Sequence, residues 1–117
     1  MDVNLGLIIL CIDLKQSTPQ ILLEDGQIPT QKLDGHPLLF CEQICKDFLE
    51  IDTKWIDFIL VDVKYDDDLT LYYTCMIPKI IKTKKGEWES IGAVHENFQK
   101  LVFEAGQRAI SRRPTGI

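Results

Sequence analysis

Residues 38–51 restrict the fold of this chain more than any other segment. At about 100° per residue, polar side chains fall on one arc of a helix and apolar side chains fill the other. The polar arc holds Glu42, Gln43, Lys46, Asp47 and Glu50, and the apolar arc holds Phe40, Cys41, Ile44, Cys45, Phe48 and Leu49. The pattern predicts an amphipathic α-helix that Asp52 and Thr53 end. Runs typical of β-strands lie on both sides of it, so we expect an α+β fold.

The part of the chain before this helix predicts two strands and a loop. Leu5–Asp13 and Gln20–Glu24 are apolar runs separated by the breakers Ser17, Thr18 and Pro19, and we expect them to pair as a hairpin. Residues 25–37 contain two glycines and two prolines and show no apolar period. We therefore expect residues 25–37 to form one long irregular loop.

The part after the helix predicts a second hairpin. Trp55–Tyr65 and Leu69–Ile77 are rich in β-branched and aromatic residues, and three aspartates between them signal a turn. Residues 79–87 are typical of a connecting loop with Gly86 at its tip. Trp88–Ile91 is expected to be a short strand.

A second amphipathic helix is predicted for Glu96–Ser111, begun by His95 or Asn97 and followed by a flexible basic tail, residues 112–117. The length of 117 residues, with 45% hydrophobic and 26% charged residues, fits one folded domain over residues 1–117. No apolar run approaches the roughly 20 residues of a membrane span, and residues 1–12 lack the features of a signal peptide.

The cysteines and the net charge indicate the redox compartment and the classes of partner to expect. All four cysteines lie in apolar segments, which favours thiols in a reducing cytoplasm. Cys41 and Cys45 could share a helix face, but a metal site would need further ligands, so core packing is favoured. The net charge of −5 argues against a general nucleic-acid binder. Lysines cluster in residues 79–85, either as a solvated patch or to meet phosphates of a substrate.

The order of these elements resembles the Nudix hydrolase fold over almost the entire chain. Leu22-Leu23 looks like the strand that leads into the family's signature box, Ile28-Pro29 stands where a Leu-Pro-Gly-Gly turn is common, and Glu87-Trp88 resembles a late strand. The resemblance implies a mixed sheet packed between two main helices.

The signature box itself is degenerate. The family pattern ends in Arg-Glu-U-x-Glu-Glu-x-Gly-U, where U is aliphatic and the helical glutamates hold divalent metals against a diphosphate. In one register Asp34 replaces an early glutamate and only Asp47 remains as a helical acid. In a second, residues 46–50 imitate Arg-Glu-U-x-Glu and keep Asp47 and Glu50, three apart on one helix face. The position of Pro29 favours the second register.

The resemblance suggests roles for particular residues. Asp47 and Glu50 would be the catalytic acids and would bind Mg²⁺, with Glu87 or Glu104 completing the metal ligands. Lys46, Trp88 and Tyr73 would contact the substrate, the aromatic rings by stacking on a base. For Trp88 the alternative is packing in the core, which its residue type favours. The competing interpretation is that Asp47 and Glu50 belong to an ordinary solvated helix face.

Three functions are consistent with these features. The first is a Nudix-like domain that has lost hydrolysis and binds a nucleotide-like small molecule or a protein partner, including a second copy of itself. The second is a divergent Mg-dependent hydrolase of nucleoside diphosphate derivatives. The third is a small α+β interaction protein whose likeness to Nudix proteins is only topological. Activity is therefore left open, and the expected location is the cytoplasm.

Overall fold

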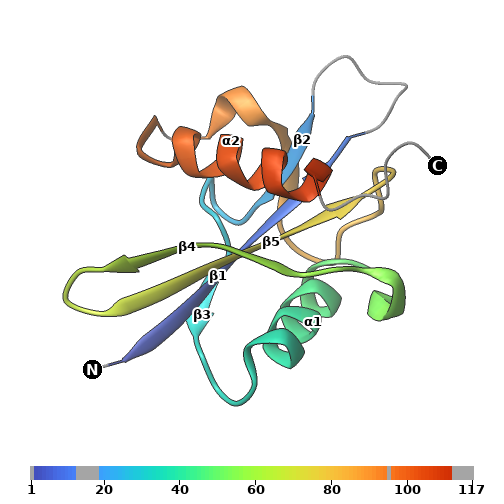
Figure 1. The fold of residues 1–117 in the computed structure, drawn as a ribbon. Helices are drawn as coiled ribbons and strands as arrows, with labels where there is room; N and C mark the ends of the chain where they lie inside the picture. The colour runs from blue at the N-terminus through green and yellow to red at the C-terminus, as the bar shows by residue number, and fades with distance from the viewer. Residues whose placement is uncertain (1, 13–18, 95, 112–117) are drawn as a thin grey trace.

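The computed structural model describes residues 2–12, 19–94 and 96–111. Its elements, in chain order, are β1 (Val3–Cys11), β2 (Gln20–Leu23), β3 (Thr30–Lys32), α1 (Pro37–Phe48), η1 (Thr53–Trp55), β4 (Ile59–Tyr65), β5 (Leu69–Ile77), β6 (Glu87–Ser90), η2 (Ile91–Ala93) and α2 (Glu96–Ser111). A mixed sheet lies between α1 and α2 (Figure 1), which confirms the expected fold class. His95 and the basic tail lie outside the described residues. The helix α2 begins one residue before Asn97.

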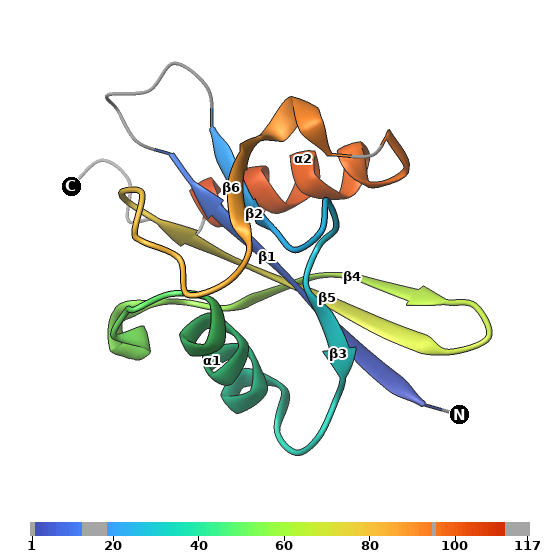
Figure 2. The same ribbon diagram turned by 180° about the vertical axis from the view of Figure 1, so that it is seen from behind.

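The sheet is organised around β1. It pairs in parallel with β5 from Val3↔Leu69 to Cys11↔Ile77, and antiparallel with both β2 and β3. The strand order is β4-β5-β1-β2-β6, with β3 attached to β1 beside β2 (Figure 2). Both predicted hairpins, β1 with β2 and β4 with β5, are confirmed. Because helices cover both faces of β1, its apolar run is continuous rather than alternating.

A separate hydrophobic cluster lies on each face of the sheet. On the α1 side, Leu5, Leu7 and Ile9 of β1 pack against the buried face of the helix. On the α2 side, Ile8 and Leu10 of the same strand pack with the buried residues of α2. Because neighbours in a regular strand point to opposite sides, these two clusters show to which side of the sheet the side chains of β1, β2, β5 and β6 point.

The helix α1 begins and ends slightly earlier than predicted. His36 precedes it, and the Nδ1 atom of His36 accepts a hydrogen bond of 3.2 Å from the Leu38 amide. The helix ends at Phe48 because Leu49 is extended, with φ −130° and ψ 145°, and forms a bridge with Thr83. The predicted continuation to Ile51 is therefore wrong. A contact with a distant segment, rather than Asp52 and Thr53, ends the helix.

The prediction of one irregular loop over residues 25–37 is also wrong. Glu24 and Gln27 exchange two backbone hydrogen bonds of 2.8 and 3.0 Å around a turn in which Asp25 has φ 52° and Gly26 φ 76°. These positive φ values are those of a two-residue hairpin turn, for which Asp-Gly is a strong sequence signal. The chain then forms β3, which pairs with β1 over three residues.

Smaller differences affect the segments around β4 and β6. Trp55 lies in the short helix η1 and is 83% exposed, so the strand predicted from Trp55 begins only at Ile59. The Asp52 carboxylate accepts a hydrogen bond of 3.0 Å from the Lys54 amide, which favours the turn over a strand. The strand β6 begins and ends one residue earlier than the predicted Trp88–Ile91. No helix in the described part of the chain is long and apolar enough to cross a membrane.

Candidate functional site

The outer face of α1 carries the residues that the signature box would supply. Asp47 is half-buried, and its Oδ1 atom accepts a hydrogen bond of 2.9 Å from Gln43 Nε2. Lys46 beside it is exposed. Glu50 is also exposed, but it lies two residues beyond the end of α1. Because Leu49 is extended, Asp47 and Glu50 do not share a helix face as the second register assumes.

The two acids considered as a third metal ligand lie on the other side of the sheet. In β6, Glu87 pairs with Leu23 and points to the α2 side with it, whereas Trp88 pairs with Leu22 and points to the α1 side. Glu104 is on α2 itself. Within the described ranges, no three His, Cys, Asp or Glu side chains gather in a way that could hold a metal ion.

The two aromatic residues expected to contact a base lie on the α1 side, but apart. Trp88 is half-buried against the α1 cluster, and its Nε1 atom donates a hydrogen bond of 2.8 Å to the Ile81 carbonyl. Tyr73 packs against the same cluster from β5, where burial first and Cys41 second raise the pKa of its phenol. Three strand spacings separate β5 from β6, or about 14 Å, so the two rings do not form one stacking surface.

The segment between β5 and β6 passes beside the end of α1 (Figure 2), and hydrogen bonds hold it there. The Lys84 amide donates a hydrogen bond of 2.7 Å to the Phe48 carbonyl, and Lys84 Nζ donates one of 3.0 Å to the Lys46 carbonyl. Lys85 Nζ lies 4.5 Å from the centre of the Phe48 ring. A cation at the C-terminal end of a helix is favourable because the carbonyl groups there carry partial negative charge. We call Lys46, Lys84 and Lys85 the lysine corner.

A polar hollow of about 420 Å³ adjoins this corner. Lys85 lines it, paired with Glu24 at 3.7 Å, and three further carboxylates reach it from the Asp25 turn and from β6. Of these acids, only Glu87 was predicted to take part in a site, and Glu24, Asp25 and Glu89 were not. Two sequence signals point to segments that line the hollow. Asp25-Gly26 is a typical hairpin turn, and Glu87 and Glu89 alternate as residues on one face of a strand do.

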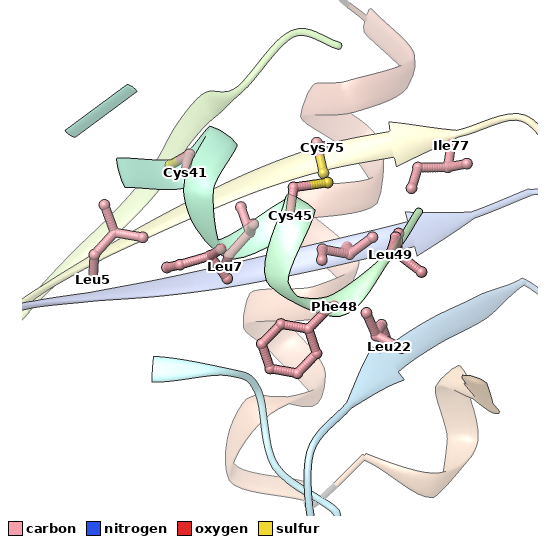
Figure 3. Packing of buried hydrophobic residues seen from close by; sticks show 11 residues of the cluster. Leu5, Leu7, Leu22, Cys41, Cys45, Phe48, Leu49, Cys75 and Ile77 are labelled. Carbon is pink, nitrogen blue, oxygen red and sulfur yellow. The ribbon is translucent and has the colours of Figure 1, made fainter. Parts of the chain in front are cut away.

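The cysteines occupy the core, as predicted. Cys41 and Cys45 lie on the buried face of α1, and Cys75 lies opposite them on β5 (Figure 3). Cys11 is buried at the end of β1. The side chains of Cys41, Cys45 and Cys75 are all completely buried, so the helix face that carries Cys41 and Cys45 packs against the sheet.

No protein-family model and no curated protein matches the sequence. Solved structures do match. The chain superposes on the NUDIX domain of Shewanella oneidensis NrtR, in complex with ADP ribose, with TM-score 0.62 and 10% identity over 91% of this chain and 86% of that one. A mutT/nudix family protein from Listeria innocua gives TM-score 0.63 and 9% identity over 94% of both chains.

A third structure is the C-terminal domain of mouse MUTYH in complex with human PCNA. It gives TM-score 0.60 and 10% identity over 100% of this chain and 94% of that one. Identities this low establish the fold and nothing finer. The chain therefore has a Nudix-like fold.

Proposed function

We propose that this Nudix-like domain binds a nucleotide-like ligand without hydrolysing it. The observation that carries the proposal is the lysine corner, where Lys84 Nζ is fixed 3.0 Å from the carbonyl of Lys46, the residue directly before Asp47. An ammonium group has three donors, so Lys84 keeps two for a phosphate. Nudix hydrolases carry metal-binding acids on the corresponding helix, whereas here the lysine corner lies at the C-terminal end of α1.

The positions of the acids support binding over hydrolysis. Metal-assisted attack on a diphosphate needs carboxylates that converge on one point. On α1 itself, Asp47 is held by Gln43, while Glu50 follows the end of the helix. Glu87 points to the opposite side of the sheet. Bringing these three carboxylates together would require α1 to extend and a strand to change register.

The proposed ligand is a nucleoside diphosphate derivative. ADP ribose is the molecule bound in the NrtR domain, and its diphosphate has the charge that Lys46 and Lys84 would neutralise. Trp88 lies on the same side of the sheet as α1 and would contact the base through its exposed part. Tyr73 lies about 14 Å away across the sheet and takes no part in this arrangement.

Titration calorimetry with ADP ribose tests the proposal, once in EDTA and once in Mg²⁺. We expect binding in both and no released phosphate or nucleotide. Replacing Lys84 or Lys46 by Met removes a charged donor and should weaken binding roughly 10- to 100-fold. Lys100→Met is the matched control, because Lys100 is an exposed lysine on α2, across the sheet. Failure of ADP ribose and related diphosphates to bind would overturn the proposal.

Two alternatives remain as outcomes of the same experiments. Mg-dependent cleavage that Asp47→Ala or Glu50→Ala abolishes would favour a divergent hydrolase. If no nucleotide binds, a protein partner becomes the better proposal, which the MUTYH domain bound to PCNA makes a specific alternative. Sedimentation of the purified chain would then test for a homodimer.

A further inference from the structure

Two thiols from distant parts of the chain meet in the core under α1. Cys45 is on the helix and Cys75 is on β5, and Figure 3 shows their sulfur atoms pointing toward one another. Both side chains are completely buried. Cys41 lies one helical turn before Cys45 in the same cluster. The pair therefore links the helix that bears the lysine corner to the strand next to the centre of the sheet.

A hydrogen bond between the two thiols makes them unequal. It lowers the pKa of Cys45 and raises the pKa of Cys75, and burial adds to the effect on Cys75. Burial opposes the lowering of the pKa at Cys45, but the direction makes Cys45 the sulfur of the pair that gives up its proton more easily. Burial, followed by the charges of Cys45 and Glu42, raises the pKa of Cys41 to about 12, which keeps that thiol protonated.

We propose that Cys45 and Cys75 are an oxidative modification site, at which a small hydroperoxide converts the two thiols into a disulfide between α1 and β5. Cys45 gives up its proton and its sulfur attacks the peroxide oxygen, the O–O bond breaks, and the leaving hydroxide takes up the proton as water, giving a sulfenic acid. The Cys75 sulfur then attacks the Cys45 sulfur and displaces the hydroxyl group, which leaves as water. With hydrogen peroxide, two thiols and one peroxide give one disulfide and two waters.

The enclosure of the pair selects the oxidant. Hydrogen peroxide is uncharged and little larger than water, whereas glutathione disulfide is far too large to reach sulfur atoms with no exposed surface. Hydrogen peroxide reaches the pair through small local openings of α1, so the rate of the reaction follows the stability of the helix against the sheet. The disulfide would close a loop between residues 45 and 75. It would thereby restrict the unfolded chain and stabilise the folded protein.

Treating the native protein with hydrogen peroxide, quenching with an alkylating agent and mapping the peptides by mass spectrometry tests this site. We expect a species that has lost two hydrogen atoms and contains a peptide joining Cys45 to Cys75. Cys11 and Cys41 should remain alkylable after unfolding. The midpoint of thermal unfolding should rise and return to its first value after reduction. Modification of Cys11 or Cys41 in preference to this pair would overturn the proposal.

Variants separate the pair from its neighbours. Cys41→Ala should still form the crosslink, whereas Cys45→Ala and Cys75→Ala should not. If Cys45→Ala or Cys75→Ala fails to fold, the peptide map of the peroxide-treated wild-type protein is sufficient to test the proposal. Native protein that keeps all four thiols, under conditions that oxidise the unfolded chain, would count against the site. The readout uses no ligand, so it is independent of the binding proposal.

Discussion

A β-carbon at Gly86 would lie 2.9 Å from the carbonyl oxygen of Leu23. The Phe48 ring closes the other side, with an atom 3.1 Å from the same position, and Gly86 has φ +79°. The chain passes between β2 and α1 here, immediately before β6. Only glycine combines the left-handed backbone with so little space, so this residue lets the lysine segment reach the end of the helix.

Gly86→Ala should therefore lower the free energy of unfolding by about 2–4 kcal/mol, combining the cost of the left-handed backbone with that of overpacking. Gly35→Ala is the matched control, because Gly35 has φ +84° and no atom within 4 Å of an added β-carbon. It should cost only about 1–2 kcal/mol. Chemical denaturation of both variants makes the comparison. Equal losses would mean that the contacts with Leu23 and Phe48 relax without cost.

Trp88→Phe should destabilise the protein by about 1–2 kcal/mol, since the hydrogen bond from Nε1 to the Ile81 carbonyl is lost. Limited proteolysis should then cut residues 79–86 more readily. Trp55→Phe serves as the control, because Trp55 is 83% exposed and its loss should change stability by less than about 0.5 kcal/mol. That variant also leaves Trp88 as the sole tryptophan fluorophore. A larger effect at Trp55 would contradict the assignment of Trp88 to the core.

Thr74→Val should cost about 1 kcal/mol, because the completely buried hydroxyl of Thr74 donates a hydrogen bond of 2.9 Å to the Ile8 carbonyl. Valine keeps the shape of the side chain, so the change reports on the hydroxyl. Thr70→Val on the same strand and the same face is half-buried and should be nearly neutral. Urea unfolding measures both. A stabilised Thr74→Val protein would show that this hydrogen bond contributes less than the desolvation of its hydroxyl.

Alkaline pH should weaken the fold through Cys41. The pKa of this thiol rises from 9.0 to about 12 on folding, mainly because it is buried. Above pH 9.0 the unfolded chain loses this proton while the folded chain keeps it, so the free energy of unfolding falls until about pH 12. One proton gives a slope of about 1.4 kcal/mol per pH unit. Denaturation under reducing conditions should show a shallower decline for Cys41→Ala, and an unchanged slope would contradict the assignment.

The elements with the longest regular patterns could be predicted from the sequence. The apolar run in β1 and the helical period of α1 depend on many residues each, so one exception changes little. The turn at Asp25 and Gly26 was missed because the prolines and glycines around it suggested an irregular loop. The strand β3 is only three residues long and has no period of its own. The end of α1 depends on Thr83, which no local pattern reveals.

The candidate site was less accessible to prediction because it depends on which face of the sheet each strand presents. Spacing alone placed Asp47 and Glu50 on one helix face, but the extended backbone of Leu49 separates them. Alternation shows that Glu87 and Trp88 point to opposite sides. It does not show that Trp88 faces α1, since that follows from the pairing of β6 with β2. The contact between Lys84 and Lys46 joins residues 38 positions apart.

The position of β1 at the centre of the sheet affects how this chain folds as it is synthesised. The strand β1 precedes β5 and is almost entirely buried, yet β5, its parallel partner, follows 66 residues later in the sequence. Until β5 leaves the ribosome, one edge of β1 lacks its final neighbour, and unpaired apolar strands aggregate readily. The pairing of β1 on this edge therefore waits for Leu69–Ile77, and a chain that stops before this strand would need a chaperone more than one that stops after it.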